Sequence, residues 1–341
     1  MDIWNLNTLW FALIAVLWVG YFFLEGFDFG VGMLLPFVSD DDLDRRVVIN
    51  TIGPVWDGNE VWLLVAGGAT FAAFPEWYAT LFSGFYLPLF LILVALIIRG
   101  VAFEFRGKED SARWRATWDW AIVIGSFLPA LLWGVAFANI LRGVPIEMVN
   151  GYHEYTGGFW NLLNPYALVG GLASLSLFLL HGALFLSLKT EGTVKDRVDA
   201  LLRLLAWPAV GLVLAFMVWT YIDLGEGLIP GLLPLLAVVG LVAIPYLALG
   251  KKNGWAFIAT GAAIALIVAT LFIILYPNVL PSSVDAAASL DVYNAASTNL
   301  TLKVMTVVAV IFTPVVLVYQ SWTYWVFRKR IGRETLSPAS H

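Results

Sequence analysis

Long runs of apolar residues alternate with short polar connections along almost the whole chain. A run of about 20 apolar residues is long enough to cross the hydrocarbon core of a bilayer as a helix. The pattern therefore predicts an all-α polytopic membrane protein with nine transmembrane helices and no separate soluble domain. The predicted spans are residues 9–37, 55–74, 77–98, 117–140, 165–188, 204–222, 228–249, 255–275 and 302–327.

The positive residues are distributed unequally between the two sets of connections. Of the 19 Lys and Arg residues, all except Arg142 and Lys303 fall on one side of the predicted spans or in the C-terminal tail. Because positively charged loops stay in the cytoplasm, this distribution predicts an N-terminus outside and a C-terminus in the cytoplasm. No basic segment precedes the opening apolar run, since the first positive residue is Arg45. We expect that run to be a retained membrane helix rather than a cleaved signal peptide.

The composition supports the same class of protein and excludes several kinds of site. Hydrophobic residues make up 60% and charged residues 13% of the 341 residues, and the mean hydropathy is +0.84. The net charge of −5 argues against a nucleic-acid partner. Because the chain has no cysteine, iron–sulfur clusters, thioether-attached haem, thiolate metal sites and disulfides are excluded.

Acidic residues inside the apolar spans are the main candidates for function. Asp57 and Glu60 open the second span, and two further acids lie three residues apart in the inner part of the first. Residues with this spacing share one face of a helix. Arg99 is the nearest positive partner, and all these residues are expected to converge on the cytoplasmic side of the first four spans. The predicted polar cluster consists of Glu25, Asp28, Asp57, Asn59, Glu60, Arg99, Glu104 and Asp119.

Two interpretations of this cluster follow from the energetics of the bilayer. An ionised acid in the hydrocarbon costs about 3 kcal/mol on insertion scales, so acids there are paired, protonated or hydrated. One interpretation is a proton-uptake route that opens on the cytoplasm. The other is a polar network that fixes helix packing, which is favoured by the GxxxG pair of Gly26 and Gly30 beside Asp28. The two interpretations are compatible.

Trp56 and His181 bear on cofactor binding. Trp56 is interpreted as a core or interface aromatic residue, with contact to a quinone-type head group as the alternative. His181 is the only histidine within a predicted span, since His153 lies in a loop and His341 at the terminus. Bis-histidine haem ligation needs two such residues, so we expect His181 to pack or form hydrogen bonds, and we expect no metal site in this chain. The alternative is a His–Met haem site with Met33, Met217 or Met305.

Four stretches resemble subunit II of the cytochrome bd-type quinol oxidases. The first two are specific, and the second half of the chain is similar mainly in its layout of spans. The stretches are FFLEGFDFGVGML at 22–34, NTIGPVWDGNEVWL at 50–63, RGVAFEFR at 99–106, and Trp118-Asp119.

The resemblance implies a fold of two four-helix bundles and a peripheral ninth helix. The first bundle would comprise about residues 1–140 and the second residues 141–275, followed by an outer loop, the ninth helix and the tail in 276–341. The family's complex oxidises quinol and reduces dioxygen to water in the bacterial cytoplasmic membrane, without pumping protons. In that complex the haems b558, b595 and d and the quinol-oxidation loop belong to subunit I, a separate chain, and subunit II binds no haem.

The resemblance also implies partners and a role for one acid. The chain would form a heterodimer with subunit I, and small single-span accessory subunits and lipids are further expected partners. The family's proposed proton route uses the acid that follows the tryptophan, which falls on Asp57, and leads toward the oxygen-reducing haem of subunit I. Two other functions stay open from the residues alone: a stand-alone proton-coupled transporter or channel, and a purely structural partner whose acids only pack.

Overall fold

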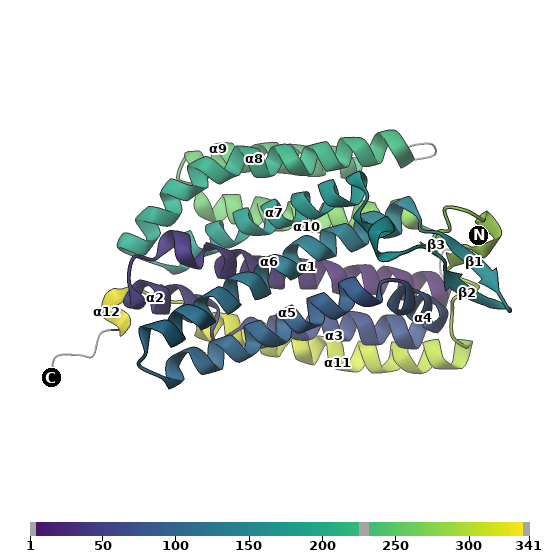
Figure 1. The fold of residues 1–341 in the computed structure, drawn as a ribbon, viewed down its shortest axis with the longest axis horizontal. Coiled ribbons are helices and arrows are strands. Elements are labelled where there is room, and N and C mark those ends of the chain that lie inside the picture. Colours follow the sequence, from purple (N-terminus) through teal and green to yellow (C-terminus); the bar gives the residue numbers. More distant parts are fainter. Residues whose placement is uncertain (1–4, 225–231, 337–341) are drawn as a thin grey trace.

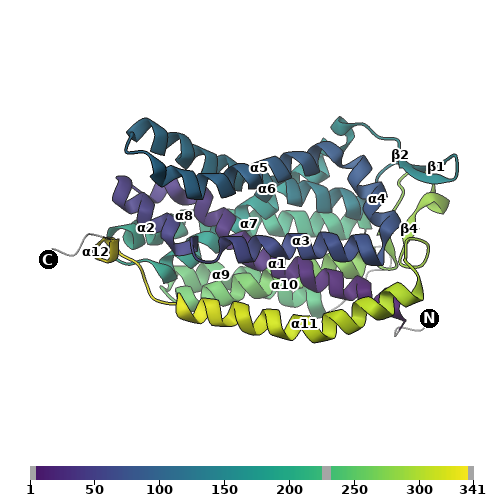
Figure 2. The ribbon, with the colours of Figure 1, turned by 90° about the horizontal axis from the view of Figure 1, so that it is seen from below.

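Long helices run side by side along the longest axis of the molecule in the computed structural model (Figure 1), and a second view shows them in several layers (Figure 2). The structure describes residues 5–224 and 232–336. Its elements, with 3-10 helices written η, are α1 (Leu6–Val38), α2 (Asp42–Ile52), α3 (Trp56–Ala73), α4 (Pro75–Gly84), α5 (Tyr86–Phe105), η1 (Arg106–Lys108), α6 (Ala112–Arg142), β1 (Ile146–Val149), β2 (Tyr152–Tyr155), η2 (Phe159–Leu163), α7 (Pro165–Lys189), α8 (Thr193–Leu224), α9 (Leu232–Leu249), α10 (Asn253–Leu275), β3 (Asn278–Leu280), η3 (Ala286–Ala288), β4 (Leu290–Asp291), α11 (Asn299–Val326) and α12 (Arg333–Leu336).

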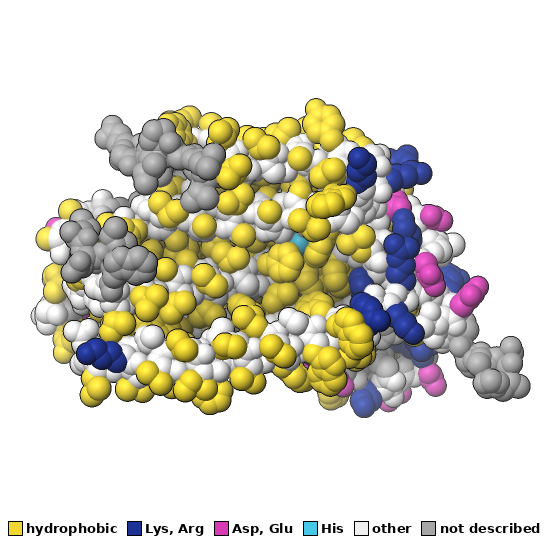
Figure 3. Space-filling model, turned by 180° about the vertical axis from the view of Figure 1, so that it is seen from behind, with side chains coloured by type: hydrophobic (Ala, Val, Ile, Leu, Met, Phe, Trp, Pro, Cys, Tyr) yellow, Lys and Arg dark blue, Asp and Glu magenta, His cyan; other side chains and the backbone are white. Residues whose placement is uncertain are grey.

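The two ends of the helix array differ in structure and in charge. One end, here called the charged end, carries α2, η1 and α12 (Figure 1). The opposite end, here called the hairpin end, carries α4 and two small antiparallel sheets, β1–β2 and β3–β4. Figure 3 shows apolar side chains along the length of one face, with most of the visible Lys, Arg, Asp and Glu side chains gathered at one end. This separation is typical of a protein embedded in a bilayer, because charged side chains are costly in the hydrocarbon.

Seven helices of the described chain are long and apolar enough to cross a membrane, namely α1, α5 with η1, α6, α7, α8, α10 and α11. The predicted spans 55–74 and 228–249 correspond to α3 and α9, which run alongside these helices (Figures 1 and 2). α3 is less apolar because it opens with acidic and amide side chains, and residues 228–231 of the other span lie outside the described residues. Nine crossings and the division into two four-helix bundles therefore stay predictions.

The predicted span 77–98 is wrong as a single helix. Its first part belongs to α4, which ends at Gly84, and its second part belongs to α5, which begins at Tyr86 and continues to Phe105. At 1.5 Å per residue the 10 residues of α4 are too short to cross the hydrocarbon. The break at Phe85 does not interrupt the hydropathy pattern, because only Ser83 and Gly84 separate it from the apolar residues that precede it. α4 packs against α3 and β2 at the hairpin end.

α1 lies at the centre of the helix array. It packs against α3, α6, α7, α10 and α11, and every residue from Glu25 to Leu35 is buried. A helix that is buried on all sides over three turns has no face toward lipid or water. The acids Glu25 and Asp28 must therefore find their partners on the surrounding helices.

α1 and α7 approach each other closely at two glycines. A Cβ atom on Gly30 would lie 2.2 Å from the carbonyl oxygen of Phe178 and 2.7 Å from Cα of Gly182. One turn earlier, a Cβ atom on Gly26 would lie 2.7 Å from the ring of Phe178. The close backbone approach predicted from the glycine pair is therefore confirmed, with α7 as the neighbouring helix.

A buried carboxylate joins three segments at the charged end. Asp44 of α2 is fully buried and accepts hydrogen bonds from Arg197 of α8, at 2.6 Å, and from Nε of Arg333 of α12, at 2.7 Å. Burial alone would raise the pKa of Asp44, but the hydrogen bonds from Arg333 and Arg197 lower it to about 2. The carboxylate thus links α2, α8 and α12.

We expect Gly30→Ala to lower the thermal unfolding midpoint of the detergent-purified protein. The added methyl group has no space against backbone atoms of α7, and overpacking of this kind costs about 1–3 kcal/mol. Gly211→Ala on α8 is the matched control, because a Cβ atom there meets nothing within 4 Å. Equal midpoints for the two variants would contradict the close approach of α1 and α7.

The stability contributed by Asp44 should depend on pH in a defined window. The pKa is 3.8 for an unperturbed aspartate side chain and about 2 for Asp44 in the folded protein, a difference that corresponds to about 2 kcal/mol. Because the folded pKa is depressed, this stabilisation is present above about pH 4 and is lost as the pH falls toward 2. We expect Asp44→Asn to lower the unfolding midpoint at pH 7 and to have little effect near pH 2, as measured by tryptophan fluorescence during heating. A constant difference at all pH values would contradict this assignment.

Candidate functional site

Arg99 of α5 lies at the centre of a buried ion-pair cluster. Its side chain is fully buried, pairs with the carboxylate of Glu25 on α1, and lies 3.3 Å from Oε2 of Glu60 on α3. The guanidinium also stacks 4.7 Å from the ring centre of Phe29. Gly125 of α6 leaves room for this arrangement, because a Cβ atom there would lie 2.7 Å from Cβ of Arg99. The prediction that Arg99 is the nearest positive partner is confirmed for Glu25 and Glu60.

Asp28 lies one turn beyond Glu25 and has a different partner. Its carboxylate is fully buried, and Oδ2 accepts a hydrogen bond of 2.7 Å from the side-chain amide of Asn59 on α3. The carbonyl oxygen of the same amide accepts hydrogen bonds from the hydroxyl of Tyr324, at 2.7 Å, and from Nε2 of Gln320, at 3.3 Å. Asn59 therefore connects the acid on α1 to two side chains on α11.

Gln320 and Tyr324 are site residues that the sequence analysis missed. They lie four residues apart, so they share one face of a helix that is otherwise largely apolar. That polar pair within an apolar run was the available signal. What it could not indicate was the partner, because Asn59 precedes Gln320 by 261 residues.

Several polar atoms of the cluster have no hydrogen-bond partner among the described residues. All of them are buried, and they include both donors and acceptors, so the cluster has unused capacity to bind water or a transferred proton. The atoms are Oε2 of Glu25, Oδ1 of Asp28, and Nε and Nη1 of Arg99.

Asp57 differs from the other acids because its side chain is on the surface of the chain. It lies in the first turn of α3, where its Oδ1 accepts a hydrogen bond of 2.7 Å from the backbone N–H of Gly58. The neighbouring Trp56 is half-buried, and its ring lies 5.1 Å from that of Phe103. Trp56 thus has an aromatic packing partner, and the alternative of a quinone contact stays a prediction.

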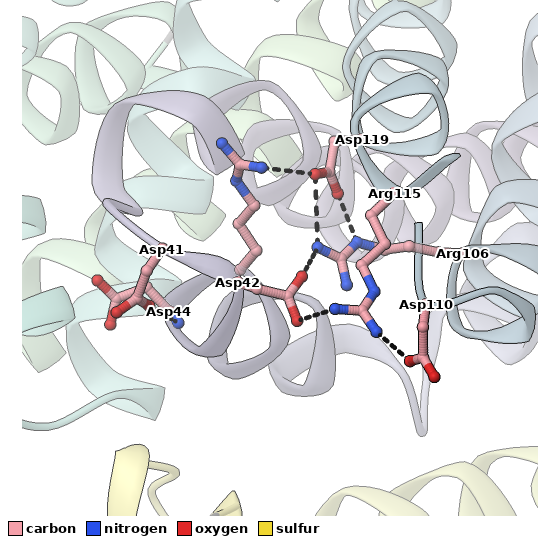
Figure 4. Close-up of polar contacts among 8 residues, drawn as sticks. Asp41, Asp42, Asp44, Arg106, Asp110, Arg115 and Asp119 are labelled. Carbon is pink, nitrogen blue, oxygen red and sulfur yellow. Dashed lines mark hydrogen bonds and ion pairs between the residues drawn. The ribbon is translucent and has the colours of Figure 1, made fainter. Parts of the chain in front are cut away.

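Glu104 and Asp119 do not join the buried cluster. Glu104 is exposed, whereas Asp119 lies at the charged end and accepts hydrogen bonds from Nε of Arg106, at 2.5 Å, and from Arg45, at 3.1 Å. Figure 4 shows that Arg106 also reaches Asp42, which in turn contacts Arg115. The expectation that all six acids converge was therefore wrong. Arg106, 13 residues before Asp119, and Arg45, 74 residues before it, draw Asp119 into a separate network.

His181 is held by hydrogen bonds on both ring nitrogens. Nε2 donates to the backbone carbonyl of Phe23, at 3.1 Å, Nδ1 is 2.7 Å from the hydroxyl of Thr260, and the ring stacks on Phe257 with 4.5 Å between centroids. The predicted packing and hydrogen-bonding role of His181 is confirmed. Because both nitrogens are used, this geometry does not fit ligation of a haem iron by His181.

Other metal sites can be judged only within residues 5–224 and 232–336. In that part of the chain no group of three or more His, Cys, Asp or Glu side chains could hold a metal ion. His341 lies outside the described residues. The polar groups gathered at the described site are carboxylates, an amide and an arginine, so the candidate chemistry of the site rests on its carboxylates.

Comparison with known proteins places these residues in a family. The model of the family "Cytochrome bd terminal oxidase subunit II" matches residues 6–327. The chain is 44% identical over 336 residues to the cytochrome bd ubiquinol oxidase subunit 2 of Bacillus subtilis (strain 168), covering 97% of this chain and 98% of that protein. It is 39% identical over 371 residues to the cytochrome bd-I ubiquinol oxidase subunit 2 of Escherichia coli (strain K12), covering 98% of each.

The fold is similar to that of a solved structure as well. A chain of the bd oxidase from Geobacillus thermodenitrificans superimposes with a TM-score of 0.74, covering 95% of this chain and 99% of that one. Its sequence identity of 18% means that this likeness concerns the fold alone. Since the family model and two full-length relatives agree, the chain belongs to the cytochrome bd terminal oxidase subunit II family.

Proposed function

We propose that this chain is the haem-free subunit of a bd-type quinol oxidase, that it stabilises a haem-bearing subunit I, and that it conducts protons from the cytoplasm toward that partner. The observation that carries the proposal is full-length similarity to proteins named as ubiquinol oxidase subunits, at 44% identity for the Bacillus subtilis protein. The chain is accordingly a multi-pass protein of the bacterial plasma membrane. Reduction of dioxygen to water consumes protons as well as electrons, so such a complex needs a proton supply.

The exposed position of Asp57 supports a role at the contact with a partner. On the same side of α3, Val61 and Leu64 are exposed and apolar, as expected of a surface that faces lipid or protein. An ionised carboxylate facing lipid there would cost about 3 kcal/mol. Water or a polar partner surface next to Asp57 removes that cost, and either one suits proton transfer.

The exposed face of α3 also suits close packing by another helix. Gly58, Gly67 and Gly68 have no atoms within 4 Å of the position that a Cβ would occupy, and Phe71 is exposed one turn further on. In membranes, small residues on a helix surface allow a second backbone to approach closely. This face is where we place subunit I.

The carboxylates are better suited than Arg99 to carry the proton. A guanidinium stays protonated in proteins, so Arg99 acts as a fixed positive charge. Glu60 is partly exposed and only 3.3 Å from Arg99, and it lies one turn along α3 from Asp57. We infer a path that starts at the charged end, which the excess of Lys and Arg assigns to the cytoplasm, and that uses Asp57 and Glu60 with Asp28 as an inner acid.

We expect Asp57→Asn to lower oxygen consumption by the complex at least about 10-fold, because a positioned proton-transfer group contributes about 10²–10⁴-fold to rate. Cytoplasmic alkalinisation in inverted vesicles should fall in parallel, while haem content stays normal. Asp196→Asn is the matched control, since Asp196 is an acid at the charged end of α8, outside the cluster. Normal turnover in the fully assembled Asp57 variant would remove Asp57 from the path.

Proton flux through this chain alone in vesicles would support the transporter alternative.

Loss of one partner of the buried ion pair should be more harmful than loss of both. We expect Arg99→Met to lower the yield of assembled complex strongly, because leaving a buried charge unpaired costs about 3–5 kcal/mol. Glu25→Gln combined with Arg99→Met should recover part of that yield, as measured by haem content per purified complex. A double variant that assembles worse than either single variant would contradict the ion-pair assignment.

A further inference from the structure

We propose that α11 orients the inner acid of the path, with Tyr324 and Gln320 as positioning residues that act on Asp28 through Asn59. The proposal rests on the proton-carrying role proposed above for this cluster. It concerns the direction of a chain of hydrogen bonds that runs from α3 to α11, back to α3 and then to α1.

The direction of this chain begins at a group that can only donate. The indole N–H of Trp62 donates to Oε1 of Gln320, at 2.9 Å. An indole has no acceptor atom, so the carbonyl end of Gln320 must face Trp62. The amino end of Gln320 is then directed at Oδ1 of Asn59, 3.3 Å away.

Asn59 is fixed in the same way one step later. Its Oδ1 accepts from both Gln320 and the hydroxyl of Tyr324, so its amino group points to Oδ2 of Asp28, at 2.7 Å. Turning the amide around would place two amino groups against each other and a carbonyl oxygen against a carboxylate. The two donors on α11 therefore prevent the reversal of Asn59.

This orientation determines which oxygen of Asp28 can carry a proton. Oδ2 faces a donor, so it must act as an acceptor. Oδ1 is buried and has no hydrogen-bond partner among the described residues. A proton held by Asp28 is thus confined to Oδ1, on the side of the carboxyl group away from α11.

The contacts of α11 indicate which of its residues can position Asp28, because only Gln320 and Tyr324 among the described residues of α11 donate hydrogen bonds to Asn59. Leu302 near the hairpin end is the one buried residue of α11, where the indole N–H of Trp10 donates to its carbonyl oxygen and to the hydroxyl of Thr306. Near the charged end, Tyr324 and Gln320 form the polar contacts of α11 with the residues around Asp28.

The test is isotope-edited infrared difference spectroscopy on the purified two-subunit complex containing ¹³C-labelled aspartate. The infrared stretching band of the Asp28 side chain, from either its carboxyl or its carboxylate form, is identified as the band that is missing in Asp28→Asn. We expect Tyr324→Phe and Gln320→Leu to shift this band, because each removes one of the two donors that hold Asn59 in its orientation toward Asp28. Turnover should fall roughly 2- to 10-fold, the value for loss of one hydrogen bond, with KM for quinol unchanged and haem content normal.

Two further variants make the outcome specific. Tyr319→Phe is the matched control, because Tyr319 is an exposed tyrosine of the same helix, and it should leave the band and the turnover unchanged. Trp62→Phe removes the donor at the start of the chain and should shift the Asp28 band even though it leaves α11 intact. If an α11 variant assembles poorly, Trp62→Phe still tests the same chain of hydrogen bonds without a change in α11.

The possible results separate the two proposals. An Asp28 band that is the same in native, Tyr324→Phe, Gln320→Leu and Trp62→Phe complexes would overturn the positioning role, as would a fall in turnover that accompanies loss of haem without a band shift. Normal turnover in Asp28→Asn would overturn the proton-carrying role of Asp28. A band shift in the α11 variants would still support positioning in that case.

Discussion

The permanent positive charge of Arg99 in an apolar interior is the constraint on which the centre of this structure depends. The guanidinium cannot become neutral by losing its proton, and it is fully buried on α5. Neighbouring helices must therefore supply carboxylates next to the guanidinium. α1 supplies Glu25 and α3 supplies Glu60. α6 supplies a glycine where a side chain would collide with the arginine. The relative positions of four helices thus follow from the need to accommodate one charge.

Around this charge the acids have distinct environments. Glu25 is held by Arg99, Asp28 by an amide, and Asp57 is exposed beside an apolar surface. A fully paired carboxylate is a poor proton carrier because its charge is already compensated, whereas one that faces a neutral donor or a surface can change its protonation state more readily. The same cluster can therefore fix helix packing through some residues and serve transport through others, so the two interpretations of the sequence do not compete.

Much of the fold could be predicted from hydropathy, because each of the seven long apolar helices overlaps a predicted span, although α5 matches only the second part of the span 77–98. The acids on α1 and α3 and their arginine were also predictable, since residues three apart share a face and charges in lipid must pair. Hydropathy indicates depth in the membrane but not direction around the helix axis. For that reason Asp119 and Glu104 were expected to join the cluster around Arg99, and Gln320 and Tyr324 were missed. The break at Phe85 depends on local backbone geometry within an apolar run, which composition does not reveal.

The carboxylate of Asp44 has a consequence for the order in which the molecule can be completed. Its partner Arg333 follows it by 289 residues, while Arg197 follows by 153. During synthesis Asp44 leaves the ribosome long before either arginine exists, so its carboxylate depends on water until almost the entire chain has been inserted. Closure of the charged end is therefore a late event in biogenesis, and it can follow only when the preceding helices are in place.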